Sequence, residues 1–299
     1  MLALVLSLAL VSPEPVSHAV PQNTAASDVS GYWTSDRMGS ARPVAPARAA
    51  PPRHPRDRRA HRAGQDRHTA VDQGDEAAAQ RRQGLLHHGR PGLLVLGERR
   101  ELRGRNLLAT AAHCVYDAKR WAKNWIFIPG YSYSRGKHLR PYGVWTMTKA
   151  VIEPEWARSY DPDYDYAFVT VGKYRGRNVA NVVGAQGIRW NQPAKVSVLI
   201  YGYPAEYPWN GSRVVGCSRT TELDTVPAAR VARHRFARCT LNGGSSGGPW
   251  IRNYSSATGT GYLVGVQSMK WMNSSGVTTW NSSPYLGDRA YKLYLKLGR

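Results

Sequence analysis

The sequence predicts an all-β fold from about residue 106 to the C-terminus. The apolar stretches in this part are only four to six residues long and are bounded by Gly, Pro, Asn or Asp, which is typical of short strands joined by turns. Only one segment, near the C-terminus, has helical spacing. Because the chain has 299 residues, it can bury a substantial core, and many short strands then indicate a sandwich or a barrel.

The expected strands lie between turn residues along the chain. They cover residues 107–110, 125–128, 167–171, 196–201 and 262–267. One further segment, 289–297, is expected to form a helix, although its later alternation is also compatible with a strand.

The N-terminal segment has the composition of a signal peptide. An apolar stretch is followed by a Pro-containing polar segment and by small residues on both sides of His18, ending at Ala19. We therefore expect residues 1–19 to be removed and the protein to be secreted into the extracellular space. A buried helix or strand is the alternative, and the lack of a basic residue before the apolar stretch favours it.

Residues 41–105 differ in composition from the rest of the chain. They contain 15 Arg, 5 His and 7 acidic residues but no Lys, Ile, Phe, Tyr or Trp. Such a segment cannot bury enough apolar surface to offset the entropy of ordering it, so we expect it to be disordered or poorly formed as written. Three explanations stay open: a basic tail that binds nucleic acid, a pro-segment linker, and a stretch read in the wrong frame. One shifted reading places a cysteine where Val95 stands.

Two motifs contain the residue types that nucleophilic catalysis needs. The motif TAAHC puts His113 at the end of an expected strand, where a rigidly held imidazole can exchange a proton near neutral pH. The motif GGSSGGPW surrounds Ser246 with glycines, which let backbone N–H groups point into one cavity and let a substrate backbone approach. A core histidine and a flexible loop are the structural alternatives.

An acidic residue stands just before the expected strand 167–171. Strand alternation puts Asp165 on the same face as the small residue Ala167, so its carboxylate can turn inward and orient a buried imidazole. Asp161 and Asp163 are the alternatives for this role, and any of these carboxylates could simply cap a turn.

The three motifs, in the order His113, Asp165, Ser246, resemble those of trypsin-like, chymotrypsin-fold serine peptidases, especially the secreted bacterial branch that includes glutamyl endopeptidases. The similarity covers residues 106–299, and the GYWTSDRM segment at 31–38 resembles the pro-segment of that branch. The resemblance implies two antiparallel six-stranded β-barrels, chymotrypsin-like in arrangement. It also implies a serine endopeptidase that works through an acyl-enzyme, without a cofactor or a metal.

The same resemblance gives the matched residues their roles. Ser246 is implied to be the nucleophile, His113 the general base and then acid, and Asp165 the residue that orients His113. The N–H groups of Gly244 and Ser246 are implied to form the oxyanion hole.

The substrate pocket is less well defined by the resemblance. Thr240 and Ser268 are expected to line it by their positions in the motifs. Gln267 stands where glutamate-cleaving relatives carry a histidine, so acidic specificity lacks its usual support and the preferred side chain stays open. Ser245 stands where digestive relatives have an aspartate, so activation by pairing that aspartate with a new N-terminus is not available.

The chain has three cysteines, without the CxxC spacing of a zinc knuckle. In an exported protein we expect Cys217 and Cys239 to form a disulfide that bounds the pocket loops, with two buried free thiols as the alternative. In the family, Cys114 pairs with a cysteine on the preceding strand, and this sequence has no such cysteine.

The charge of the chain suggests an anionic partner at first sight. The formal net charge is +21, but 15 Arg against 7 acidic residues places +8 of it in residues 41–105. The location of the charge therefore weakens the case for a nucleic-acid partner. The resemblance to serine peptidases implies a protein or peptide substrate, and we expect no nucleic-acid partner, no membrane partner and a monomer.

These observations divide the chain into three parts. We expect a signal peptide at 1–19, a pro-segment with the Arg-rich region at 20–83, and a peptidase domain at 84–299. The two barrels would occupy about 84–180 and 181–299. The alternative function is a catalytically inactive homologue that acts as a binding protein, because the Arg-rich region as written does not supply strands for the first barrel.

Overall fold

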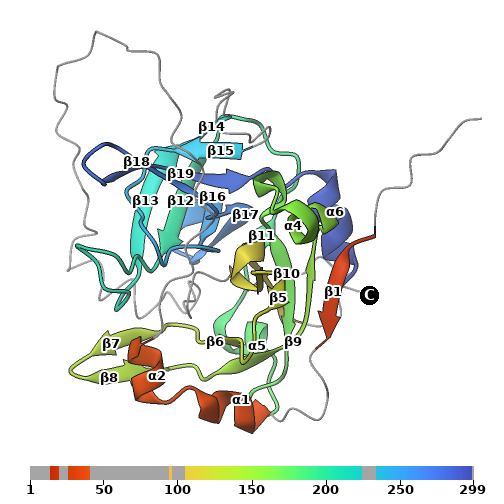
Figure 1. Ribbon diagram of the computed structural model, residues 1–299, viewed down its shortest axis with the longest axis vertical. Coiled ribbons are helices and arrows are strands. Elements are labelled where there is room, and N and C mark those ends of the chain that lie inside the picture. Colours follow the sequence, from red (N-terminus) through yellow and green to blue (C-terminus); the bar gives the residue numbers. More distant parts are fainter. Residues whose placement is uncertain (1–13, 20–25, 41–93, 96–104, 224–233, 298–299) are drawn as a thin grey trace, which may run out of the picture.

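The structure is a computed structural model that describes residues 14–19, 26–40, 94–95, 105–223 and 234–297. Within these residues the chain is mainly β-strand, arranged as three larger sheets and two short hairpins (Figure 1). The expectation that the Arg-rich segment is disordered concerns residues that lie outside the described ones, apart from a two-residue strand at 94–95 and Arg105.

The first sheet contains the strands next to the His113 and Asp165 motifs. Its order is β1-β9-β10-β3-β2, and β6 also pairs with β9. The strands are Val16–Ala19 (β1), Leu94–Val95 (β2), Leu107–Thr110 (β3), Ile126–Phe127 (β6), Trp145–Ile152 (β9) and Ala167–Val171 (β10). All neighbouring pairs in this sheet are antiparallel, as the sequence predicts for a barrel of short strands.

Strand β3 is buried on both faces because two hydrophobic cores meet at it. Leu108 belongs to a core that includes Phe127 and Trp145. Leu107 and Ala109 belong to a second core. Since successive side chains of a strand point to opposite faces, an uninterrupted apolar run is what a strand between two cores requires.

The second half of the chain forms two further sheets. One has the order β11-β17-β16-β12-β13, and the other has the order β14-β15-β19-β18. The strands are Gly187–Ile188 (β11), Ser197–Gly202 (β12), Val215–Thr220 (β13), Glu222–Leu223 (β14), His234–Ala237 (β15), Pro249–Ser255 (β16), Thr260–Val266 (β17), Lys270–Met272 (β18) and Thr278–Pro284 (β19). A third core, with Ile200, Leu241 and Trp250, fills this half.

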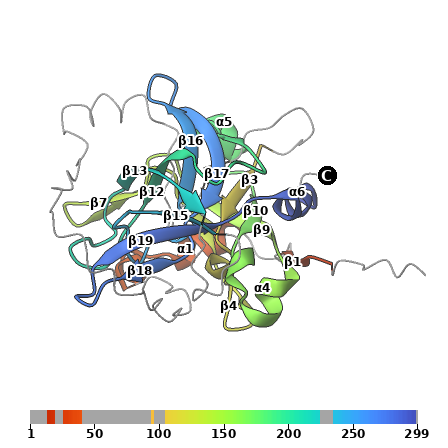
Figure 2. The same cartoon turned by 90° about the horizontal axis from the view of Figure 1, so that it is seen from above.

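The second core joins the two halves. It brings Phe168 of β10 together with Ile251 of β16, Leu263 of β17 and Leu293 of the C-terminal helix α6 (Asp288–Leu295). Helix α6 lies beside β10 in both ribbon views (Figures 1 and 2). The burial of these apolar side chains fixes the first sheet against the second half of the chain.

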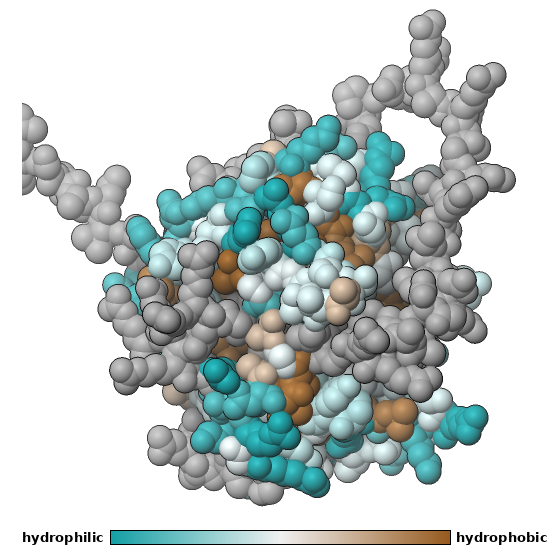
Figure 3. Space-filling model, turned by 180° about the vertical axis from the view of Figure 1, so that it is seen from behind, coloured by the Kyte–Doolittle hydropathy of each residue, from teal (hydrophilic) through white to brown (hydrophobic). Residues whose placement is uncertain are grey.

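The remaining described elements are short. They are the helices Ala26–Tyr32 (α1), Ser35–Ser40 (α2), Pro154–Ser159 (α4) and Val179–Val183 (α5), the 3₁₀ turns Ala112–Cys114 (η1) and Pro162–Tyr164 (η2), and the hairpins Tyr116–Asp117/Arg120–Trp121 (β4/β5) and Ser132–Ser134/Lys137–Leu139 (β7/β8). None of the helices in the described ranges is long and apolar enough to span a membrane. On the face seen in Figure 3, hydrophobic residues form separate spots among hydrophilic ones, as on most protein surfaces.

The N-terminal segment packs against the first half of the chain. Strand β1, the end of the expected signal peptide, forms the edge of the first sheet and pairs with β9. The indole Nε1 of Trp33 donates to the backbone carbonyl of Asn124 at 2.6 Å, and Met38 is only 3% exposed in a cluster with Tyr131. Segment 31–38, which resembles a pro-segment, is thus docked on the protein, and the signal peptide and the pro-segment stay predictions.

The described structure confirms the expected strands with small shifts at their ends. Segments 107–110 and 167–171 are strands as predicted, 125–128 shortens to 126–127, 196–201 becomes 197–202, and 262–267 becomes 260–266. The helical interpretation of the C-terminal segment is confirmed as α6, whose apolar side chains at Ala290, Leu293 and Tyr294 recur at helical spacing and are buried.

Cys217 and Cys239 form the expected disulfide, with their Cα atoms 6.2 Å apart. Cys217 lies on β13, and Cys239 follows β15 in the chain, so the bond connects the two sheets of the second half. Cys114 is a free and buried cysteine.

We expect the disulfide to stabilise the protein by restricting the unfolded chain. Closing a loop of 22 residues corresponds to about 3 kcal/mol of unfolding free energy. The double variant Cys217→Ser, Cys239→Ser should therefore lose about this amount in urea denaturation followed by circular dichroism. An unchanged unfolding midpoint would show that the bond contributes nothing, and the Cys114→Ser variant controls for loss of a thiol alone.

Candidate active site

His113 and Asp165 are brought together by the pairing of β3 with β10. In this antiparallel pair Thr110 lies opposite Ala167, so the residues just after β3 and just before β10 meet at the same edge of the sheet. Nδ1 of His113 lies 2.7 Å from Oδ2 of Asp165. The backbone N–H of His113 also donates to Oδ1 of Asp165 at 2.9 Å. Both carboxylate oxygens therefore hold one histidine, which fixes its ring and directs Nε2 away from Asp165.

The two side chains are removed from water, and each stabilises the charge of the other. Burial lowers the pKa of His113, but the Asp165 carboxylate outweighs this effect and raises the pKa well above its ordinary value. Burial raises the pKa of Asp165, but His113 and a hydrogen bond from Ser268 outweigh it and the pKa is lowered. Asp165 thus stays ionised, and His113 binds a proton more strongly than an ordinary histidine does.

The structure distinguishes Asp165 from the two neighbouring acids. Asp161 accepts a hydrogen bond from the backbone N–H of Asp163 at 3.1 Å and so caps the turn η2. Asp163 lies with Oδ1 3.7 Å from Nε2 of His234. Asp165 is therefore the member of this acidic group that contacts His113.

Ser268 makes a contact that the sequence did not predict. Its hydroxyl donates to Oδ2 of Asp165 at 2.6 Å, and the residue is only 2% exposed. The expectation that Ser268 and Thr240 line the substrate pocket stays a prediction, and the bond to Asp165 is an additional contact of Ser268. Thr240 is exposed.

The Ser246 loop is attached to the same strand region as Ser268. The N–H of Gly247 donates to the carbonyl of Gln267 at 2.7 Å, and the N–H of Gln267 donates to the carbonyl of Gly248 at 2.7 Å. Because Gln267 immediately precedes Ser268, this pair of bonds places Ser246 close to the residue that holds Asp165. Ser246 is 5% exposed.

Gly244 occupies a position that only glycine can fill. Its φ is +100°, and a Cβ atom there would lie 2.5 Å from the carbonyl oxygen of Tyr203. Within the described parts of the chain, neither the N–H of Gly244 nor that of Ser246 donates to another group. These two N–H groups are therefore free to bind an oxygen that develops negative charge.

The hydrogen bond between Ser246 and His113 is not formed in this structure. Nε2 of His113 is buried and has no hydrogen-bond partner among the described residues, so it is not bonded to Oγ of Ser246. Catalytic hydrogen bonds are often long in a free enzyme and tighten when substrate binds. The uncommitted Nε2 is the nitrogen that can accept the proton of an attacking hydroxyl.

The model of the trypsin family matches residues 102–281, which is more than half of the chain and includes the histidine, the aspartate and the serine described above. The chain belongs to the trypsin family. It is a serine protease, a hydrolase that acts on protein substrates. No curated protein matches the sequence.

Solved structures of bacterial proteases are similar to this trypsin-family chain. The protease Anisep from Arthrobacter nicotinovorans is 28% identical, with a TM-score of 0.60 over 71% of this chain and 97% of its own. The thermostable serine protease AL20 from an extremophilic microorganism is 27% identical, with a TM-score of 0.59 over 70% and 96%. A Glu endopeptidase, solved with MPD, is 18% identical with a TM-score of 0.51 over 69% and 89%, and shows the fold alone. The expected chymotrypsin fold is thus confirmed.

A partly buried network supports the Asp165 segment of this trypsin-family protein from the side of α6. Arg289 of α6 donates to Glu153 at 2.7 Å and to Glu155 at 2.8 Å. The hydroxyl of Tyr166, next to Asp165, donates to Glu153 at 2.9 Å. Burial raises the pKa of Glu153, although Arg289 opposes the shift. Sequence patterns do not reveal this network, because its members are far apart in the chain.

His234 supports the same segment from the second half. Its Nε2 lies 2.7 Å from the carbonyl oxygen of Pro162 in η2, and its Nδ1 lies 2.8 Å from Oγ of Ser282. Burial lowers the pKa of His234 and favours the neutral ring. His234, which is buried on β15, thus links the second half of the chain to η2, the turn that precedes Asp165.

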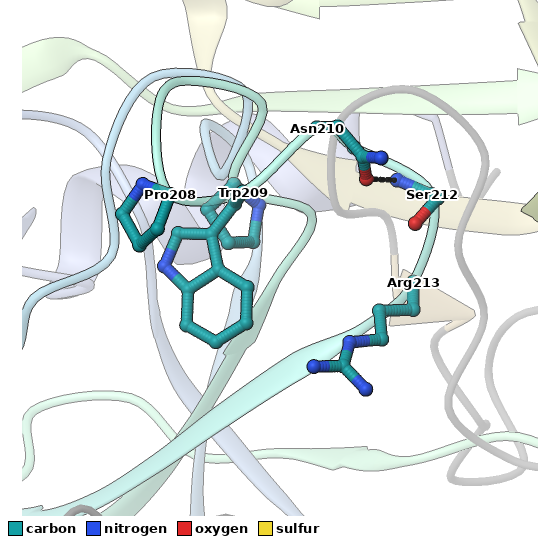
Figure 4. A pocket seen from close by; sticks show the side chains of 7 residues that line it. Pro208, Trp209, Asn210, Ser212 and Arg213 are labelled. Atoms are coloured by element: carbon teal, nitrogen blue, oxygen red, sulfur yellow. Dashed lines mark hydrogen bonds between the residues drawn. The ribbon is translucent and has the colours of Figure 1, made fainter.

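A hollow lies on the loop between β12 and β13. It has a volume of about 360 Å³ and is lined by Pro204 and residues 208–213 (Figure 4). The indole of Trp209 and the guanidinium of Arg213 lie on its wall, with 5.7 Å between the Arg213 Cζ and the ring centroid. The same loop carries Ala205, whose N–H donates to the carbonyl of Gly243 at 2.6 Å. The hollow is therefore a neighbour of the Ser246 loop.

We expect proteolytic activity to fall at acidic pH, because only the neutral imidazole of His113 can accept a proton. Its pKa is raised, so the acidic limb of kcat/KM should have its midpoint above about pH 6.5. Asp165→Asn removes the main cause of that shift, so its limb should move to lower pH while kcat falls by about 10⁴.

The measurement is kcat/KM from pH 4 to 10 on a casein-derived peptide mixture. The matched control is Asp163→Asn, which should leave both the midpoint and the rate near those of the unmodified protein. If the acidic limb of the Asp165→Asn variant keeps the midpoint of the unmodified protein, Asp165 is not the cause of the raised pKa of His113.

Proposed function

We propose that the chain is a secreted serine endopeptidase that uses a catalytic triad of Ser246, His113 and Asp165. The observation that carries the proposal is the buried pair of His113 and Asp165, which leaves Nε2 as the one uncommitted ring nitrogen. The triad roles come from the family motifs, and the geometry of the pair supports them.

The proposed reaction forms and hydrolyses an acyl-enzyme. Oγ of Ser246 attacks the peptide carbonyl carbon while Nε2 of His113 takes the hydroxyl proton. The N–H groups of Gly244 and Ser246 stabilise the negative oxygen of the tetrahedral intermediate. His113 then gives the proton to the leaving amine as the C–N bond breaks. A water molecule attacks the acyl group by the same steps in reverse, and the acid is released.

Asp165 and Ser268 act as orienting residues in this proposal. Asp165 stabilises the imidazolium that forms during each step and holds the proton on Nδ1. Ser268 donates to the same carboxylate, which keeps Asp165 ionised inside the protein. No step requires a cofactor or a metal.

Secretion, the zymogen form and the glutamyl-endopeptidase-like branch are further parts of the proposal. Secretion rests on the signal-like residues 1–19, and the zymogen form rests on the resemblance of 31–38 to a pro-segment. The branch rests on the motifs, but Gln267 differs from it. The Gln267 side chain is buried and bonded to Trp250 Nε1 at 3.3 Å and to the Met269 carbonyl at 3.0 Å.

The proposed nucleophile can be tested by labelling with a fluorophosphonate, which reacts with an activated serine. We expect the unmodified chain to be labelled on Ser246, and Ser246→Ala and His113→Ala to lose labelling together with about 10⁶ of kcat. The readout is a labelled tryptic peptide identified by mass spectrometry.

Ser245→Ala is the matched control for the labelling experiment. Ser245 is adjacent, buried at 1% exposure, and its hydroxyl has no partner among the described residues, so its removal should leave labelling intact. If the unmodified, folded chain is not labelled, the peptidase proposal fails and a catalytically inactive binding homologue takes its place.

A further inference from the structure

A carboxylate is held beside the Ser246 loop by an ammonium group and a backbone N–H group. Oε2 of Glu206 is bonded to Nζ of Lys270 and accepts a hydrogen bond from the N–H of Gly243 at 3.1 Å. One oxygen atom thus receives both donors. Glu206 lies on the loop between β12 and β13, whereas Lys270 begins β18.

This carboxylate site lies next to the groups that are proposed to carry out the reaction. Gly243 immediately precedes Gly244, one of the two oxyanion donors. Lys270 follows Ser268 by two residues, and Ser268 bonds Asp165. A substrate carbonyl held by Gly244 is therefore one residue from the N–H that binds the Glu206 carboxylate. A substrate side chain beside that carbonyl would therefore be bound close to the Gly243 N–H and Lys270, the two donors that hold Glu206.

The two partners of the ion pair differ in how firmly they are held. The Lys270 side chain is 17% exposed, whereas the Glu206 side chain is 46% exposed. Exposed ion pairs contribute little to stability, so little is lost when Glu206 is replaced by another carboxylate. Lys270 is the more enclosed partner, so its side chain has less freedom to move when another carboxylate replaces Glu206.

The site also favours the ionised form of its ligand. Burial raises the pKa of Glu206, but the hydrogen bonds from Lys270 and from the N–H of Gly243 outweigh it, and the pKa is lowered. Donors that stabilise one carboxylate in this position will stabilise a second one in the same way.

We propose that Lys270, together with the N–H of Gly243, binds an acidic side chain of the substrate at the residue that carries the scissile carbonyl, and that Glu206 occupies this site in the free enzyme. Glu206 is then an internal competitor that an acidic substrate must displace. The proposal rests on the proposed peptidase function. It gives acidic specificity a source other than position 267, where Gln267 is neutral and bonded within the protein.

The first test compares matched peptides cleaved by the unmodified chain. Mass spectrometry of a digested peptide library identifies a cleaved bond, and peptides with Glu, Gln or Leu before that bond are then compared by kcat/KM. We expect Glu to be favoured over Gln by about tenfold or more, the size of one charge-assisted hydrogen bond. Equal rates on Glu and Gln peptides would overturn the proposal.

Two variants assign the preference to these residues. Lys270→Met should lower kcat/KM much more on the Glu peptide than on the Gln peptide and so bring the two to equal values, because the ammonium binds a carboxylate more strongly than an amide oxygen. Glu206→Gln keeps an acceptor for the Gly243 N–H but removes the competing charge, so it should raise kcat/KM on the Glu peptide and leave the Gln peptide unaffected. A preference for Glu that survives in Lys270→Met would overturn the proposal.

The controls separate this proposal from the peptidase function on which it rests. Lys292→Met removes an exposed lysine of α6 and should change neither rate. Fluorophosphonate labelling of Lys270→Met at the rate of the unmodified chain shows an intact site. If the unmodified chain is labelled but shows no preference for Glu, only the proposed role of Lys270 is contradicted. If the unmodified chain is not labelled, the peptidase function is contradicted.

Discussion

The hydrogen-bonded pair of His113 and Asp165 is the interaction on which the rest of the site depends. Two ionisable groups are taken out of water, which is costly unless each finds charge and hydrogen-bond partners. Both oxygens of Asp165 are used, by the ring and the backbone N–H of His113 and by the hydroxyl of Ser268. The partners come from both halves of the chain. The pair itself forms within the first sheet, whereas the bond from Ser268 requires the second half to be docked, and the shared core containing Phe168 and Leu263 supplies the apolar burial that docks the two halves.

The loop that carries Ser246 holds two backbone N–H groups in place without bonding them to other groups of the described protein. Gly247 and Gly248 exchange hydrogen bonds with Gln267, so the loop is anchored on its C-terminal side. Gly244 has a positive φ and a close contact with Tyr203, so the loop turns sharply on its N-terminal side. Between these anchors two N–H groups, those of Gly244 and Ser246, have no acceptor among the described residues. Such fixed donors stabilise a developing charge without reorganisation during the reaction.

The ion pair of Lys270 and Glu206 is a second case of fixed donors beside the groups proposed to react. The loop that carries Glu206 supplies the carboxylate that pairs with Lys270 in the free enzyme, and because this pair is partly exposed, another carboxylate can replace Glu206 at little cost. An enzyme built in this way exchanges an internal carboxylate for a substrate carboxylate, and its selectivity is the difference between the two. His234 and Arg289 both contact the turn η2, through the carbonyl of Pro162 and the hydroxyl of Tyr164.

The sequence by itself determined the short strands, the helix near the C-terminus, the disulfide between Cys217 and Cys239, and the identity of His113, Asp165 and Ser246 as candidates, because local patterns and motifs carry these features. Strand alternation favoured Asp165 but did not exclude Asp161 and Asp163, since all three stand in one polar turn. Only the tertiary structure decided this, through the register that sets Thr110 opposite Ala167. The bond from Ser268 to Asp165, the Arg289 network and the meeting of Lys270 with Glu206 also join residues distant in the chain. Contacts of this kind depend on how the two halves pack, which no local pattern records.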